Sequence, residues 1–94
     1  MRIEFSGEVW TWRGPAPFYF ETVPDDDSRE LKSVSGAVSY GWGMIPVRAR
    51  IGATAWKTSL FPKDGRYLVP LKDAVRRAEG IGEGDEVALE LELW

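Results

Sequence analysis

The sequence predicts a mainly β protein, a small six-stranded closed or double-split β-barrel capped by two short α-helices. Six short segments alternate apolar and polar residues with the period of a strand, and two others have helical spacing. The 94 residues suit one domain, so we expect residues 1–94 to form a single barrel. Aromatic residues make up 13% of the chain, and large rings help to fill a thin core.

The N-terminal segments predict a hairpin and then a helix. Residues 3–11 alternate as a half-buried strand, a turn containing Gly14 and two prolines follows, and residues 18–23 form the second strand. The run of aspartates at 25–27 predicts the start of a helix, with an aspartate at the N-cap. The helix has a narrow apolar stripe and is expected to end near Ser35 and Gly36; the stripe is Leu31, Val34 and Val38.

The middle of the chain predicts a loop and three strands. Residues 39–46 form an aromatic loop interrupted by glycines, and strands follow at 47–51, 53–60 and 67–71. Gly52 permits a bend, and residues 62–65 are a strong turn signal. Within the strand 53–60, one face carries Lys57 and Ser59, and the other carries Trp56, Thr58 and Leu60.

The C-terminal part predicts a short helix and the last strand. Helical spacing relates Leu71, Ala74, Val75 and Ala78, and Gly80 is placed to end that helix. Residues 82–85 form a turn in which Asp85 is expected to bond local amides. The last strand should point four apolar side chains inward, namely Val87, Leu89, Leu91 and Leu93.

The run from Val47 to Leu93 resembles domain-of-unknown-function family 1905, which occurs alone or beside the YdeI/OmpD-associated domain. The shared features are a V-x-A-x-I-G strand, a T-S-L-x-P strand end, a Y-x-x-P-L segment, an R-x-x-x-G helix exit and a G-D-x-V strand start. Residues 12–24 also fit, so the resemblance covers nearly the whole chain. It implies a double-split barrel, broadly like the AbrB and MazE barrels. The family has no established activity, so the resemblance implies no catalytic residues.

The composition excludes several kinds of chemistry. The chain has no Cys and no His, which rules out disulfides, Cys-His and Ser-His mechanisms, and His or Cys zinc sites. We expect no metal and no cofactor, since helix capping accounts for the acids at 25–27 and Glu30. No apolar run approaches the ~20 residues needed to span a bilayer, and the N-terminus lacks the apolar segment of a signal peptide. The expected location is therefore cytoplasmic, with no membrane partner.

Three glycines near the C-terminus, at 80, 82 and 84, suggest a phosphate-binding loop. Such a loop follows a strand and precedes a helix, whereas here a helix precedes and a strand follows. We therefore reject phosphate binding here and assign these glycines to a helix-to-strand turn.

Charge is segregated along the chain. Between Pro46 and Arg77 there are eight Lys or Arg residues and two acids, although the whole chain has a net charge of −3. This segment could bind an anion. The favoured interpretation is that Arg48 and Arg50 lie opposite Glu90 and Glu92 as cross-strand ion pairs on a solvated face.

The candidate ligand-binding residues come from the aromatic loop, the basic strands and the second helix. The loop around Trp42 could close over a ligand, or could simply plug the mouth of the barrel. Lys57 and Ser59 share a face, but a catalytic role would need the lysine to be buried, so exposed polarity is the favoured interpretation. The candidate set is Trp42, Arg48, Lys57, Ser59 and Arg76, and no catalytic residue is assigned.

The favoured function is a non-enzymatic binding or interaction module for a small anionic ligand or an acidic protein partner. A first alternative is an AbrB-like nucleic-acid-binding regulator, which the pI of about 4.9 disfavours. A second alternative is an enzyme, for which Lys57, Ser59 and Asp85 are the only plausible groups. A homodimer is a further prediction, because a partner copy would cover exposed strand edges.

Overall fold

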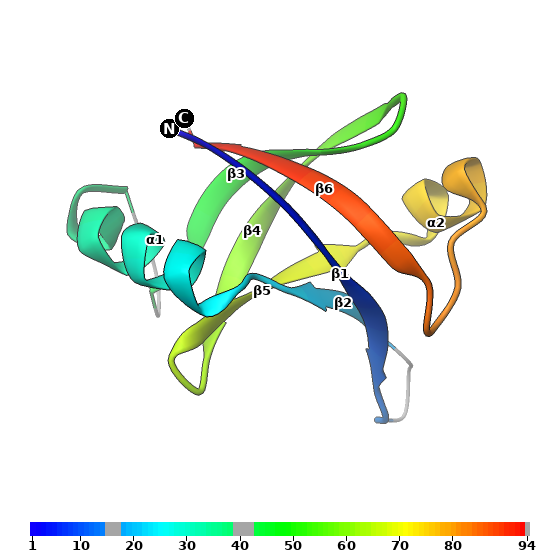
Figure 1. Ribbon diagram of the computed structural model, residues 1–94, viewed down its shortest axis with the longest axis horizontal. Coiled ribbons are helices and arrows are strands. Elements are labelled where there is room, and N and C mark those ends of the chain that lie inside the picture. Colours follow the sequence, from blue (N-terminus) through cyan, green and yellow to red (C-terminus); the bar gives the residue numbers. More distant parts are fainter. Residues whose placement is uncertain (15–17, 39–42, 94) are drawn as a thin grey trace.

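The computed structural model describes residues 1–14, 18–38 and 43–93, and within them six antiparallel strands close into a barrel (Figure 1). The order of the strands around the barrel is β1-β2-β5-β4-β3-β6, so the first and last strands are neighbours. This confirms a mainly β barrel with two helices, and it is the closed form of the two that the sequence predicts. The elements are β1 (Arg2–Trp12), β2 (Phe18–Thr22), α1 (Asp25–Val38), β3 (Ile45–Ile51), β4 (Thr54–Lys63), β5 (Arg66–Leu71), α2 (Asp73–Glu79) and β6 (Glu86–Leu93).

The barrel closes because the two longest strands each change partner along their length. The first part of β1 pairs with β6, from Arg2 to Glu8, and its last part pairs with β2, from Val9 to Trp12. In the same way β4 pairs first with β3 and then, from Phe61, with β5. The two helices lie on opposite sides of the barrel in Figure 1, and the chain termini lie side by side.

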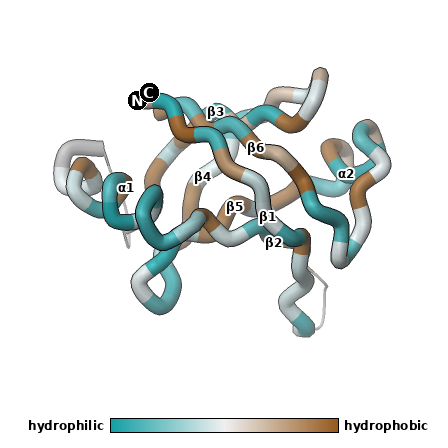
Figure 2. The backbone as a smooth tube through the Cα atoms, in the orientation of Figure 1, coloured by the Kyte–Doolittle hydropathy of each residue, from teal (hydrophilic) through white to brown (hydrophobic). Residues whose placement is uncertain are grey.

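The core lies inside the barrel and follows the period-two pattern of the strands. Four inward side chains are fully buried, namely Val9, Val47, Val69 and Leu91. The neighbours Glu8, Arg48 and Glu92 point outward and are exposed. Brown segments lie along the strands in Figure 2, and the start of α1 is hydrophilic. Leu31 closes one end of the core from α1, and Val75 is the buried residue of α2. Neither helix among the described residues is long and apolar enough to cross a membrane.

The first helix differs from its prediction at both ends. It continues through Gly36 to Val38, since a single glycine weakens a helix without ending it. Asp25 is the first helical residue, and its carboxylate bonds Arg66. The buried hydroxyl of Ser28 instead ties the helix start to the barrel, donating to the carbonyl of Val23 at 3.0 Å.

The boundaries of two strands, β4 and β5, also differ from their predictions. The strand β4 extends through Pro62 and Lys63, and the turn consists of Asp64 and Gly65, with φ of 52° and 79°. Left-handed residues at both positions are typical of the tight hairpin turns that match strand twist. Leu71 belongs to β5, where it lies opposite Tyr19 and is buried by the sheet.

The second helix is therefore shorter than predicted. It begins at Asp73, and its predicted apolar positions Ala74 and Ala78 are exposed. Gly80 ends it as predicted, with φ of 65° and its N–H donating to the carbonyl of Arg76.

Candidate functional site

A pocket of about 770 Å³ lies where the end of β1 meets β2, β5, β4 and the start of α2. Aromatic rings from three strands line it, and we call it the aromatic pocket. Pro70 and Leu71 add apolar surface, and Thr58 and Ser59 add hydroxyl groups. The complete lining is Trp12, Phe18, Tyr19, Phe20, Thr58, Ser59, Phe61, Pro70, Leu71, Lys72 and Asp73.

The aromatic side chains of this pocket form a continuous row of rings. Trp12 lies directly opposite Phe18 in the sheet, and their rings stack with centroids 6.4 Å apart. The row continues to Phe20 at 6.5 Å and then to Phe61, whose ring meets that of Phe20 edge-on at 6.5 Å. Three of these side chains remain well exposed, at 52% for Trp12, 53% for Phe18 and 39% for Phe61. Grouped exposed rings of this kind are typical of interaction surfaces.

The rim of the pocket carries charge. Lys72 donates its Nζ proton to the carbonyl of Lys57 at 2.9 Å, which holds the ammonium group beside β4. The guanidinium of Arg76 lies 3.5 Å from the centroid of the Tyr19 ring and bonds Asp73 at 2.7 Å. The Arg76 Nε is buried and has no hydrogen-bond partner among the described residues.

The residues predicted to bind a ligand fall in different places. Ser59 lines the aromatic pocket, and Arg76 touches one wall of that pocket through Tyr19. Arg48 and Lys57 lie opposite each other on the exposed outer face of β3 and β4. Trp42 lies outside the described residues. The pocket therefore contains Ser59, lies next to Arg76, and adds a row of rings that sequence analysis did not assign to a site.

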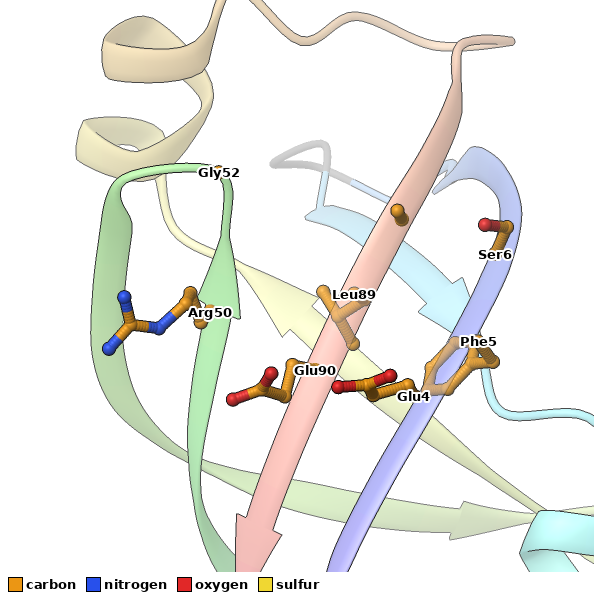
Figure 3. Close-up of a pocket in the computed structure, with 8 residues that line it drawn as sticks. Glu4, Phe5, Ser6, Arg50, Gly52, Leu89 and Glu90 are labelled. Atoms are coloured by element: carbon orange, nitrogen blue, oxygen red, sulfur yellow. The ribbon is translucent and has the colours of Figure 1, made fainter.

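The acidic strands do lie opposite the basic ones, as the favoured interpretation of the charge pattern predicted. Arg48 pairs in register with Glu92, and Arg50 pairs with Glu90. Figure 3 shows Arg50, Glu90 and Glu4 in a row across three strands. All three line a hollow of about 470 Å³. Arg2 also reaches Glu90 and Glu92, at 3.7 and 3.5 Å. These side chains are largely solvated, so this face is a mixed charged surface rather than an open cationic site.

Two of the groups considered for catalysis, Lys57 and Asp85, lie on an exposed strand face and in a turn. Lys57 is exposed, and Asp85 accepts a hydrogen bond from the N–H of Gly82 at 2.8 Å, as predicted for the turn. Across the described ranges 1–14, 18–38 and 43–93, no three Asp or Glu side chains converge as a metal site requires.

The most unusual ionisable group is Glu21, which sequence analysis did not single out. Its side chain is completely buried, and neither carboxyl oxygen has a hydrogen-bond partner among the described residues. It lies on β2 between Val9 of β1 and Val69 of β5, both also completely buried. Burial, and then the nearby charge of Glu86, raise the pKa of Glu21 from 4.5 to about 8.

A signal for Glu21 was present in the sequence. Tyr19, Glu21 and Val23 alternate along the predicted second strand, so a carboxyl had to share the face of its apolar neighbours. The alternation alone does not say which face is inward, because Phe18, Phe20 and Thr22 form an equally plausible buried face. The structure places Phe18 and Phe20 on the outer face, at the aromatic pocket.

A family model described as "Domain of unknown function (DUF1905)" matches residues 5–91. The chain belongs to the DUF1905 family. No curated protein matches it. The matched region of this DUF1905 domain contains the whole lining of the aromatic pocket, together with Glu21. The pocket and the buried carboxyl therefore both lie within the family domain.

Proposed function

We propose that this DUF1905 domain is a non-enzymatic binding module whose aromatic pocket holds a small molecule with a flat ring and an anionic group. The observation that carries the proposal is the row of exposed rings around a pocket of about 770 Å³. Small-molecule sites in proteins are typically roughly 300–1,000 Å³, with mostly apolar walls and a few polar groups. The pocket has this size and this composition.

The rings favour a flat, unsaturated ligand body. Stacked and edge-on ring contacts add to the free energy of simple apolar burial, and the exposed faces of Trp12 and Phe18 offer such contacts. An apolar ligand would cover surface that now faces water, which is the main favourable term in such binding.

The rim favours an anionic group on the ligand. The ammonium of Lys72 lies at the pocket, and Arg76 lies behind Tyr19, with an Nε that has no hydrogen-bond partner in the part of the chain that the structure describes. Asp73 already bonds Arg76, so the cationic character at the rim rests mainly on Lys72. The hydroxyls of Thr58 and Ser59 supply further donors for a carboxylate or phosphate oxygen.

The test is calorimetric titration of the whole chain with four probes: an indole carboxylate, a nucleoside monophosphate, neutral indole and an aliphatic carboxylate. We expect binding of the two anionic ring compounds, weaker binding of indole and no binding of the aliphatic acid. Phe18→Ala should abolish binding, and Lys72→Ala should reduce binding of the anions to that of indole.

Arg50→Ala is the matched control, because Arg50 is an exposed cation on the other face of the barrel, and it should bind like the parent chain. Binding that survives in both Phe18→Ala and Lys72→Ala would overturn the proposal. Salt-dependent retention of single-stranded DNA, without binding of the mononucleotide, would instead support the nucleic-acid alternative.

A further inference from the structure

The carboxyl group of Glu21 is enclosed by three strands of the barrel wall. Val9 flanks it on β1 and Val69 flanks it on β5, and all three residues are completely buried. The fit is close on the β1 side, where Gly7 leaves only the space that the side chain of Glu21 uses. Both oxygens lack hydrogen-bond partners among the described residues. A buried carboxylate without donors is costly, so this site tolerates only the neutral acid.

The charged groups around this site do not favour ionisation. Glu86, at the start of β6, faces it with a second negative charge. The inward ionisable side chains on its own strand and on β5 are the phenols Tyr19 and Tyr67. Arg76 lies over the ring of Tyr19 and already bonds Asp73.

We propose that Glu21 is a proton-operated latch in the barrel wall: β1, β2 and β5 close around the protonated carboxyl, and loss of its proton loosens β2. The latch is coupled to the aromatic pocket by sequence, because Phe18, Tyr19 and Phe20 of the same five-residue strand line that pocket. Ionised Glu21 must gain water, and water can reach it only when pairing of β2 with β1 or β5 opens.

The direction of the pH effect follows from the two states of the carboxyl. Glu21 has a pKa of about 8 in the folded chain and 4.5 when unfolded, so folding takes up one proton between these pH values. The free energy of unfolding therefore falls as the pH rises through this window, and levels off above about 8. The chain has no His and no Cys, so no other side chain has an ordinary pKa between 5 and 8.

The test measures the unfolding equilibrium by denaturant at pH values from 6 to 9, in the parent chain and in Glu21→Gln. In the parent, the unfolding constant should rise by up to about tenfold per pH unit below pH 8. In Glu21→Gln the slope should vanish. This variant keeps the N-terminal amine, so loss of the slope would assign it to the Glu21 carboxyl and not to the amine. Glu30→Gln, an exposed acid on α1, is the matched control and should keep the slope of the parent.

Two further measurements do not depend on the Gln variant folding. A ¹³C titration of the Glu21 carboxyl in the parent chain should show a midpoint near pH 8, and Glu86→Gln should move it to lower pH. Hydrogen exchange of the β2 amides, corrected for the intrinsic rate, should accelerate from pH 6.5 to pH 9 more than that of β3.

A Glu21 midpoint below pH 6, or β2 exchange that tracks β3 at both pH values, would overturn the latch. None of these measurements uses a ligand. A latch that fails while ring compounds bind leaves the proposed function standing, and the reverse outcome leaves the latch standing.

Discussion

Gly7 and Glu21 fit together inside the barrel, on adjacent parts of the wall. A Cβ atom on Gly7 would lie 3.3 Å from both the Cγ and the Oε2 of Glu21, closer than side chains normally approach. The glycine on β1 thus provides the space that the buried carboxyl on β2 occupies.

Gly7→Ala should destabilise the chain by about 1–3 kcal/mol, because the enclosed Glu21 side chain has little room to move away. Combining it with Glu21→Ala, which removes the contacted atoms, should relieve part of that loss. The measurement is a double-mutant cycle by denaturant unfolding. Gly36→Ala is the control: nothing lies within 4 Å of its added Cβ in α1, so it should stabilise the chain by about 0.5–1 kcal/mol. Equal effects of the two glycine substitutions would contradict the steric account.

Glu21→Met should stabilise the chain at pH 7 by about 1–3 kcal/mol. It replaces an acid, whose two oxygens have no hydrogen-bond partner among the described residues, by an apolar side chain of similar length. The gain should be larger at pH 9, where the parent carboxyl is ionised. Thermal or denaturant unfolding at both pH values measures it. A loss of stability at both pH values would contradict the view that the buried carboxyl destabilises the chain.

Ser28→Ala should cost about 1–3 kcal/mol, since it leaves a buried N–H without an acceptor. The Ser28 hydroxyl donates to the carbonyl of Val23 and accepts the N–H of Tyr67 at 3.2 Å, so it joins α1 to β5. Ser33→Ala is the matched control, because Ser33 is exposed and its hydroxyl donates to the carbonyl of Glu30 in the same helix. Chemical denaturation of both variants measures the free energy of unfolding. A loss below about 0.5 kcal/mol for Ser28→Ala lies within the range of ordinary surface changes and would contradict the role of this hydroxyl.

Phe18→Ala should change the free energy of unfolding by less than about 1 kcal/mol, because over half of the side chain already faces water. Leu60→Ala, at a completely buried position, should cost about 2–5 kcal/mol. Denaturant unfolding of both variants shows whether the ring of Phe18 contributes to stability as a core residue does. A loss for Phe18→Ala as large as that for Leu60→Ala would show that the row of rings serves stability.

Several features of the barrel followed directly from the sequence. The alternation of Val87, Leu89 and Leu91 set the inner face of the last strand, and all three are buried. Gly80 marked the end of α2, since a left-handed residue there favours glycine. These are local properties, and a pattern of two or four residues is enough to express them.

Other boundaries depended on pairing with neighbouring strands. Leu71 fits the apolar stripe of a helix, but pairing with β2 buries it in the sheet. Pro62 suits a turn, yet it lies within β4 beside Tyr67. In each case a tertiary contact outweighed a local preference, which a single segment cannot reveal.

The sequence by itself determined the fold class, the number of strands, the inner face of the strands with clear alternation, and the absence of His and Cys chemistry. The tertiary structure alone decided which face of β2 points inward. Each face of that strand carries both apolar and polar side chains. Closure of the barrel placed Glu21 inside, against Gly7, and placed Phe18 and Phe20 outside. The row of rings and the buried carboxyl therefore both follow from the orientation of β2, which is determined by packing among strands far apart in the chain.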